Sequence, residues 1–349
     1  MNKILGSATL LSKFRGCLQG GLMGDCCGAP YEGEKLDKPQ KYQLQKSLDE
    51  LEAKSVKVLK PYTDDTALSI ALATCLIKNG KLPHKELAKQ FCKSYFSNTN
   101  RGFGGGIPKV FIKLRSSKFE DPLLPAKEQF SGHGSYGNGA AMRVAPAALF
   151  CFNQPVENLI KLVKDSAVIT HTHYLAINGA ILLALAINYC LKIKPDEFNE
   201  QNFLTYLKYE MQKIENEGID MDDPSDEYVK QILKIEELLK REPSDEMVIN
   251  KLGNSAEALF SVPTAIYCFL RAQNTIKKIE TKNVIRRTIE YAIHLGGDTD
   301  TIASMAGSLV GSLYGEEFIS KNIISYCEAS EEISKIASQL YENWVKLNT

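Results

Sequence analysis

The sequence predicts an all-α protein built from many helices. Apolar residues recur at helical spacing along nearly the whole chain, and no run of alternating β-branched residues indicates a sheet. The chain has 349 residues, 44% of them hydrophobic, which is enough to bury a substantial core in one large domain or in two. Glycines at a spacing of four inside two of the expected helices are the third observation, because they indicate helices that pack unusually closely.

The first expected helix, over residues 14–28, carries a stripe of four glycines: Gly16, Gly20, Gly24 and Gly28. Each glycine costs about 1 kcal/mol relative to alanine inside a helix, so close backbone packing has to compensate for four of them. A matching stripe of small residues lies near the end of the chain: Ala303, Gly307 and Gly311. We therefore expect these two helices to form a tightly packed pair at the centre of the fold.

Most of the remaining chain is also expected to be helical. The expected ranges are 84–98, 139–151, 155–168, 172–192, 201–216, 225–241, 253–271, 284–295 and 329–346. The start near 225 is marked by Asp223 as N-cap followed by Pro224 at the first helical position. The charged segment over about 30–60 has weak apolar periodicity, and we interpret it as a mobile surface loop or lid.

Composition excludes several classes of function. The formal net charge is zero and the pI is near 6.9, so no general nucleic-acid or membrane-surface binding is indicated. The nine cysteines show no C-x-x-C spacing and several lie in apolar helical runs, as reduced core residues do. The longest apolar run, 175–191, carries Asn178 and Asn188 and is too short for a membrane span.

The N-terminal residues predict an intracellular protein. The short apolar stretch over 4–11 is not followed by a credible signal-peptide cleavage site, so we do not expect secretion. Lys3, Lys13 and Arg15, with no acidic residue before Asp25, keep a mitochondrial presequence open as an alternative to a plain N-terminus.

Two acidic clusters stand at helix starts that are far apart in the sequence. Residues 296–301 read Gly-Gly-Asp-Thr-Asp-Thr and residues 63–66 read Thr-Asp-Asp-Thr, each directly before an apolar run. Each cluster alone is compatible with an ordinary N-cap. Four aspartates in one pocket would repel one another unless cations lie between them, and oxygen ligands without His or Cys suit Mg²⁺ rather than zinc. The Gly-Gly pair permits unusual backbone angles, and we expect the two helix starts to meet.

A glycine-rich loop over 132–139 precedes the helix expected from Ala140. Such a loop presents N–H groups beside a positive helix end, which can hold a pyrophosphate, although a flexible turn would have the same composition. Phe130 and Tyr136 offer aromatic faces for a purine, and His171 could donate a hydrogen bond to a phosphate or a ribose hydroxyl. A second loop, 101–106, does not match the dinucleotide-binding fingerprint.

Taken together in order and spacing, these motifs resemble the ADP-ribosylhydrolase (ADP-ribosylglycohydrolase) family. The segments that carry the resemblance are 24–25, 31–32, 62–66, 134–143, 170–171, 261–265 and 296–301. The resemblance spans nearly the whole chain and implies one domain over 1–349, with an all-α orthogonal multi-helix bundle, two Mg²⁺ ions in a central cleft and a monomeric state. It also implies that the lid-like segment over about 30–60 is a flap.

The resemblance also implies roles for individual residues. One ion would be held by Thr63, Asp64, Asp65 and Asp300, and the other by Glu32, Asp298, Asp300 and Thr301. The implied substrate-binding residues are Asp64, Phe130, His133, Gly134, Ser135, Tyr136, Gly137, Asn138, Gly139 and His171. Glu32, on a glycine-flanked loop, is the candidate catalytic base.

The activity that the resemblance implies is Mg²⁺-dependent cleavage of the glycosidic bond at the anomeric carbon of ADP-ribose. The chain is most similar to family members that remove ADP-ribose from serine on proteins and degrade poly(ADP-ribose) and O-acetyl-ADP-ribose. Three alternatives remain: a hydrolase of arginine-linked ADP-ribose, a catalytically silent ADP-ribose-binding or crystallin-like protein, and a nucleotide phosphohydrolase. The cytoplasm, the nucleus and the mitochondrial matrix are all compatible with such substrates.

Overall fold

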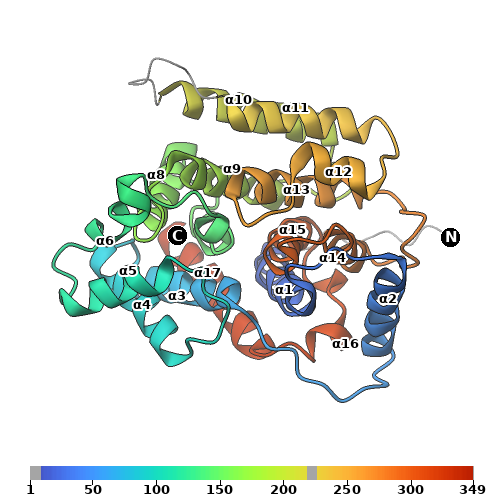
Figure 1. Ribbon diagram of the computed structural model, residues 1–349, viewed down its shortest axis with the longest axis horizontal. Helices are drawn as coiled ribbons and strands as arrows, with labels where there is room; N and C mark the ends of the chain where they lie inside the picture. Colours follow the sequence, from blue (N-terminus) through green and yellow to red (C-terminus); the bar gives the residue numbers. More distant parts are fainter. Residues whose placement is uncertain (1–8, 218–225, 349) are drawn as a thin grey trace.

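The structure is a computed structural model that describes residues 9–217 and 226–348. Within these residues helices follow one another throughout, and the only β-type pairings are isolated bridges. The all-α class expected from the sequence is confirmed. Figure 1 shows α1, α14 and α15 nearly end-on at the centre right, whereas α5, α10 and α11 run across the view, so the helices cross steeply (Figure 1).

Short turns separate most of the helices. In the first half of the chain they are α1 (Leu10–Gly28), η1 (Ala29–Tyr31), α2 (Lys38–Glu52), α3 (Asp64–Asn79), α4 (His84–Ser97), α5 (Ile107–Ser116), α6 (Leu124–Lys127), η2 (Gln129–Gly132), η3 (Asn138–Ala140), α7 (Ala145–Phe150) and α8 (Val156–Ala167). In the second half they are α9 (Tyr174–Lys192), α10 (Glu200–Glu217), α11 (Glu227–Leu239), α12 (Asp245–Leu252), α13 (Ala258–Arg271), α14 (Val284–His294), α15 (Thr299–Tyr314), η4 (Glu316–Phe318), α16 (Lys321–Ile324) and α17 (Ser330–Asn348).

Helices α1 and α15 form the central pair, and their stripes of small residues face each other. A Cβ atom on Gly16 would lie 2.6 Å from the carbonyl oxygen of Gly311, and one on Gly24 would lie 2.1 Å from that of Ala303. Real Cβ atoms do not approach backbone this closely, so glycine is what allows the two helices to touch. The expected helix pair is confirmed, and its antiparallel direction places the end of α1 beside the start of α15.

Four further helices cover this pair: α9, α13, α14 and α17. Helix α9 is the most apolar of them, with side chains buried on nearly all sides. Contrary to the expectation from the sequence, α9 is by length and composition alone sufficient to cross a bilayer, but 72% of that stretch is buried inside the fold, as is usual for the core helix of a folded domain.

The segment expected to be a surface loop over 30–60 contains a regular helix, so that expectation is wrong for Lys38–Glu52. Asp37 and Gln40 form a capping box at its start. Three leucines along one face of the helix are buried: Leu44, Leu48 and Leu51. Three apolar residues among many charged ones give weak periodicity but are enough to anchor one face of a short helix.

The helix expected over 139–151 is also wrong in its first part. A single 3₁₀ turn, η3, covers Asn138–Ala140, and α7 begins only at Ala145. Pro146 stands in the first turn of α7, where its missing N–H is tolerated, whereas in a helix continuing from residue 139 it would break a hydrogen bond. The glycine-rich loop therefore does not lead directly into a long helix.

The other expected helices are present with small shifts at their ends. The range 253–271 is the exception, because its first residues form a turn and α13 begins at Ala258. Helices α5 and α12 were not expected, and both are short. The helix start assigned to Asp223 and Pro224 lies outside the described residues.

Candidate active site

Asp25, near the end of α1, joins the central helix pair to the start of α3. Its carboxylate accepts hydrogen bonds from the backbone N–H of Thr63 at 3.0 Å and of Thr66 at 3.1 Å, and from the Thr66 hydroxyl at 2.6 Å. Burial raises the pKa of Asp25 to about 6, and these hydrogen bonds oppose the rise. Asp25 thus fixes the first turn of α3 against the end of α1.

The first turn of α3 meets the first turn of α15. The hydroxyl of Thr301 donates to Asp65 Oδ2 at 3.2 Å, and the hydroxyl of Thr63 donates to the same oxygen at 3.3 Å. The expectation that two distant helix starts meet is therefore confirmed. On its other side α3 is held by the backbone oxygen of Arg101, which accepts from the N–H of Asp64 at 2.7 Å.

The Gly-Gly pair before α15 adopts the backbone angles that its composition suggested. Gly296 and Gly297 have φ values of 68° and 72°, a region that favours glycine. Gly297 exchanges backbone hydrogen bonds with the loop that carries Glu32: its oxygen accepts from Gly33 at 2.8 Å, and its N–H donates to Glu34 at 3.0 Å. This pairing places Glu32 beside the start of α15.

Five acidic residues therefore lie together, and we call them the acidic cluster: Glu32, Asp64, Asp65, Asp298 and Asp300. One carboxylate oxygen from each of Glu32, Asp298 and Asp300 lies within 4.8 Å of the others. Glu32 is exposed, whereas the four aspartates are buried. They come from three segments of the chain, which the helix pair, the Asp25 contacts and the pairing of Gly297 with the Glu32 loop bring together.

The acidic cluster is strongly perturbed. Burial, and after it the neighbouring carboxylates, raise the pKa of Asp64 to about 8 and that of Asp300 to about 9. The same causes raise the pKa of Asp65 well above its ordinary value. Asp65 Oδ1 is buried without a hydrogen-bond partner among the described residues. The side chains of the expected metal ligands offer only carboxylate and hydroxyl oxygens as ligand atoms. These residues therefore fit a hard divalent cation.

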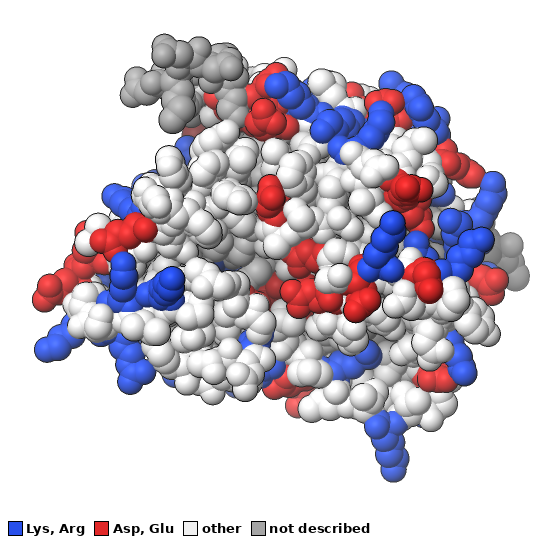
Figure 2. Space-filling view, in the orientation of Figure 1, with Lys and Arg blue, Asp and Glu red and all other residues white. Residues whose placement is uncertain are grey.

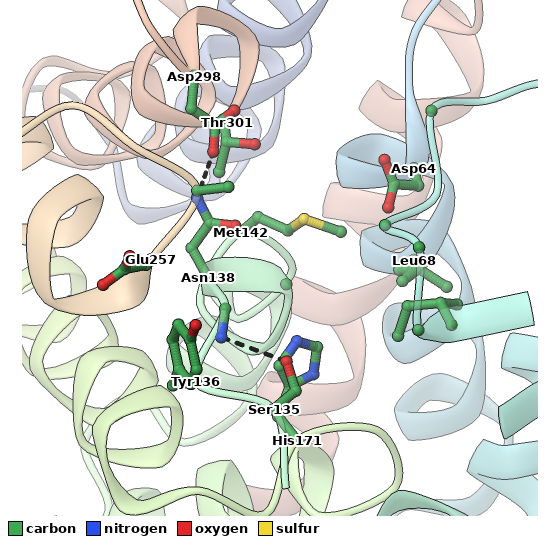
Figure 3. A pocket seen from close by; sticks show the side chains of 18 of the residues that line it. Asp64, Leu68, Ser135, Tyr136, Asn138, Met142, His171, Glu257, Asp298 and Thr301 are labelled. Carbon is green, nitrogen blue, oxygen red and sulfur yellow. Dashed lines mark hydrogen bonds between the residues drawn. The ribbon is translucent and has the colours of Figure 1, made fainter. Parts of the chain in front are cut away.

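A cleft of about 460 Å³ opens above the acidic cluster. Figure 3 shows Asp298 and Thr301 on one side of it, Asp64 on another and the loop with Ser135 and Tyr136 opposite (Figure 3). Acidic residues thus form one wall of the cleft. In the view of Figure 2 acidic side chains gather near the centre of the face shown (Figure 2).

Most residues expected to contact substrate line this cleft. They are Asp64, Phe130, Ser135, Tyr136, Gly137, Asn138, Gly139 and His171. His133 and Gly134 do not line it: His133 is exposed, and Gly134 turns the chain at a φ of 74° against Thr172. Of the expected metal ligands, Glu32, Asp64, Asp298, Asp300 and Thr301 line the cleft, whereas Thr63 and Asp65 lie behind it.

Two aromatic side chains stand exposed at the rim of the cleft. Phe130 is 55% and Tyr136 is 43% exposed, and their ring centroids are 6.1 Å apart. Phe130 is held in the left-handed region at a φ of 50°, which is uncommon for a bulky residue and is frequent at functional sites. Exposed aromatic faces beside a polar cleft suit a planar base.

Asn138 connects the glycine-rich loop to the acidic wall. Its Nδ2 atom donates to Asp298 Oδ2 at 2.6 Å and to the hydroxyl of Ser261 at 3.0 Å. The backbone oxygen of Asn254 accepts from the N–H of Asp298 at 2.9 Å. The two walls of the cleft are therefore fixed relative to each other by direct hydrogen bonds.

Sequence reasoning missed several residues that build the site. The anchoring role of Asp25, the buried Arg143 and the contacts of Arg101 and Asn254 were not foreseen. Asp25 and Arg143 both lie inside motifs that carried the family resemblance, which is a signal that more than packing depends on them.

Comparison with known proteins identifies the family. The family model described as ADP-ribosylglycohydrolase matches residues 6–348. Among curated proteins, the ADP-ribosylhydrolase ARH3 of Bos taurus is 38% identical over 98% of this chain and 95% of its own length. The ADP-ribosylhydrolase ARH3 of Homo sapiens is 38% identical over 98% and 96%, and that of Gallus gallus is 39% identical over 95% and 93%.

A solved structure titled ADP-ribosylglycohydrolase-related protein complex shares the fold. Its TM-score is 0.67 at 20% sequence identity, and the match covers 95% of this chain and 98% of that chain. The family model, the curated relatives and the fold agree over nearly the full length. The chain belongs to the ADP-ribosylglycohydrolase family.

Proposed function

We propose that this protein is a Mg²⁺-dependent hydrolase that cleaves the glycosidic bond at the anomeric carbon of ADP-ribose. We further propose that it removes ADP-ribose from serine on proteins and degrades poly(ADP-ribose) and O-acetyl-ADP-ribose. The observation that carries the proposal is the acidic cluster on one wall of a cleft whose opposite wall is a glycine-rich loop with two exposed aromatic rings. Family membership and relatives named ADP-ribosylhydrolase ARH3 support it.

Seven residues would hold two Mg²⁺ ions: Glu32, Thr63, Asp64, Asp65, Asp298, Asp300 and Thr301. Bound divalent ions would supply charge that anchors the ribose hydroxyls and makes a water more acidic. The unpartnered oxygen of Asp65 and the raised pKa values of Asp64 and Asp300, caused first by burial, support cation binding at this wall.

Glu32 would act as the general base. Burial, followed by the charge of Asp298, raises the pKa of Glu32, which makes its carboxylate a better proton acceptor. The carboxylate would take a proton from the water that attacks the anomeric carbon, while the bond to the leaving oxygen breaks through an oxocarbenium-like state. The leaving oxygen would then receive this proton from the Glu32 carboxyl, which restores the carboxylate. Two backbone hydrogen bonds hold the loop closed against Gly297, so opening of this flap would break both.

The opposite wall would bind the rest of ADP-ribose. Backbone N–H groups of the loop over 135–139 and the ring of His171 would contact the phosphates and the adenosine end. Phe130 and Tyr136 would stack on adenine.

The test is product analysis after a serine-ADP-ribosylated peptide is incubated with the protein and Mg²⁺. Release of free ADP-ribose is the expected result. Cleavage of an arginine-linked peptide alone would instead indicate a different member of the family, and release of AMP would indicate a phosphohydrolase. Absence of any product, together with no rise in melting temperature on adding ADP-ribose, would indicate a structural protein.

Glu32→Gln tests the assignment of the base. We expect hydrolysis to fall by a factor of 10² to 10⁴ while ADP-ribose still binds. Glu34→Gln is the matched control, because Glu34 is an exposed acid on the same loop, and its activity should stay near wild type. Near-normal hydrolysis by Glu32→Gln would overturn the assignment.

We also propose that the protein is an intracellular monomer that acts in the cytoplasm and the nucleus or in the mitochondrial matrix. All nine cysteines are buried and free, which is compatible with a reducing compartment. Fractionation of cells with an antibody to the chain and sedimentation of the purified protein test these two points.

A further inference from the structure

A fully buried arginine lies directly beneath the glycine-rich wall of the cleft. Arg143 donates to the backbone oxygen of Gly139 at 2.6 Å and to that of Ser166 at 3.0 Å, and its Nη2 atom also donates to the hydroxyl oxygen of Thr170 at 2.8 Å. Its guanidinium lies 4.5 Å from the ring centroid of Phe91. A buried charge is costly unless hydrogen bonds compensate it, and one of these contacts holds Gly139, which lines the cleft.

The hydroxyl of Thr170 links this arginine to a histidine. Thr170 Oγ1 lies 2.7 Å from Nδ1 of His171. A guanidinium has only donors, so Thr170 Oγ1 must accept from Arg143. The hydroxyl has one hydrogen to give, and among the described residues the ring nitrogen is the only acceptor within its reach. With Nδ1 of His171 as the acceptor this hydrogen has a partner, whereas an Nδ1–H aimed at the same oxygen would leave it without one. The first arrangement puts the proton of the neutral ring on Nε2.

The other side of the ring borders the cleft. His171 lines the cavity, and no described residue accepts a hydrogen bond from its Nε2 atom. A Cβ atom on Gly139 would lie 3.0 Å from Nε2, and one on Gly137 would lie 3.6 Å from it. Glycine at both positions keeps side chains away from this nitrogen, so a ligand in the cleft can approach it.

We propose that Arg143, acting through the Thr170 hydroxyl, is a positioning residue that fixes His171 as the Nε2–H tautomer. In this state His171 is a neutral hydrogen-bond donor to an oxygen acceptor of the substrate, a phosphate or ribose oxygen. The identity of the substrate rests on the proposed function, whereas the tautomer rests on the hydrogen bonds alone. Burial and the nearby Arg143 charge lower the pKa of His171 to about 3, which keeps the ring neutral at cellular pH.

Nitrogen NMR of the protein labelled with ¹⁵N-histidine tests the tautomer without any ligand. The chain has five histidines, and the His171 signals are identified by their loss in His171→Gln. We expect a protonated Nε2 and an unprotonated Nδ1 that do not titrate between pH 5 and 8. A wild-type spectrum with the proton on Nδ1, or with a charged ring at pH 7, would overturn the proposal.

Thr170→Val tests the hydrogen-bond relay from Arg143 through the Thr170 hydroxyl to His171, because valine has the shape of threonine without the hydroxyl. We expect the Nε2–H preference to be lost and the Kd of ADP-ribose, measured by calorimetry with Mg²⁺, to rise about tenfold. Thr170→Ser should restore both. Thr172→Val is the matched control, since the Thr172 hydroxyl donates to Ala126 and not to the ring, and it should keep the tautomer.

The two levels of the proposal fail separately. Thr170→Val with a wild-type spectrum and wild-type Kd would contradict the relay. If wild-type protein shows the Nε2–H tautomer but binds no ADP-ribose, the proposed function fails while the relay stands. Thermal melting of each variant checks that loss of binding does not come from unfolding.

Discussion

Buried aspartates of two kinds lie side by side in this protein, Asp25 and the four aspartates of the acidic cluster, and they are stabilised in opposite ways. Asp25 accepts hydrogen bonds from the backbone N–H groups of Thr63 and Thr66 and from the Thr66 hydroxyl. Each carboxylate of the acidic cluster next to it has fewer donors, and Asp65 Oδ1 has none among the described residues. Asp25 and four members of the acidic cluster are all aspartates near helix ends, so residue type does not explain the difference.

The difference separates a structural carboxylate from a ligand-binding one. Donors within the protein satisfy Asp25, so it needs nothing from outside to remain buried. The acidic cluster is left with repulsion from Asp25 and among its own members, and after the larger effect of burial this repulsion raises the pKa of Asp64 to about 8. Only a proton or a cation can compensate that repulsion. Asp25 holds the helices in place, and the acidic cluster makes their meeting point a binding site.

The largest expected effect on stability comes from removing Asp25, the structural carboxylate. Asp25→Ala leaves two N–H groups and one hydroxyl without their acceptor, and each abandoned donor costs about 1–3 kcal/mol. We expect the free energy of unfolding to fall by about 3 kcal/mol or more, measured by urea denaturation, with little recovery on adding Mg²⁺. A loss that Mg²⁺ fully restores would show that Asp25 belongs with the acidic cluster.

Mg²⁺ binding to the acidic cluster should have the next largest effect on stability. At a concentration 100 times its Kd, an ion that binds only the folded protein adds about 2.7 kcal/mol of stability. We expect wild-type protein to melt at a higher temperature with Mg²⁺ and to return to its original melting temperature with EDTA. Equal melting temperatures with and without Mg²⁺ would contradict the assignment of the acidic cluster as a cation-binding site.

A third buried carboxyl sharpens the comparison because an arginine is its partner. Glu290 lies 3.3 Å from Arg286, yet burial outweighs this attraction and raises the pKa of Glu290 to about 7. Its folded pKa exceeds the unfolded one, so its contribution is complete below pH 4.5 and is lost as the pH rises towards 7. With Mg²⁺ saturating, Glu290→Gln should change the slope of the free energy of unfolding against pH, between pH 4.5 and 7, by at most about 1.4 kcal/mol per pH unit. Parallel curves of unfolding free energy against pH for the wild type and Glu290→Gln would contradict this role of Glu290.

The smallest change is expected for Asp65→Asn without metal. Asparagine keeps an oxygen that can accept from Thr63 and Thr301 but removes one charge from the acidic cluster. We expect the metal-free stability to change by less than about 1 kcal/mol and most of the stabilisation by Mg²⁺ to be lost. A destabilisation as large as that of Asp25→Ala would mean that both carboxylates are structural.

The sequence was sufficient for the central helix pair and for the meeting of the two acidic helix starts. Glycines spaced by four and paired aspartates at helix starts are local patterns that cost stability. Few structural arrangements can compensate that cost, so the patterns are informative. The same reasoning failed for α2, where three leucines among charged residues gave too weak a signal, and for residues 139–144, where a helix was expected before Pro146.

What could not be predicted depends on partners that are distant in the chain. The acceptor role of Asp25 depends on Thr63, 38 residues away, and that of Thr170 depends on Arg143, 27 residues away. Neither pairing leaves a periodic pattern, because a hydrogen bond across the fold constrains two single positions and nothing between them. The placement of His133 outside the cleft could not be predicted either, since it follows from the path that one loop takes in the fold.

The pairing of α1 with α15 also has a consequence for how the protein is made. The Thr299 hydroxyl donates to the backbone oxygen of Gly28 across 271 residues of sequence, so the two halves of the site leave the ribosome at opposite ends of synthesis. The first helix emerges early with its glycine face uncovered, and its partner follows only when translation is almost finished. A prematurely terminated chain that lacks α15 therefore lacks Asp300 and Thr301 and cannot assemble the acidic cluster.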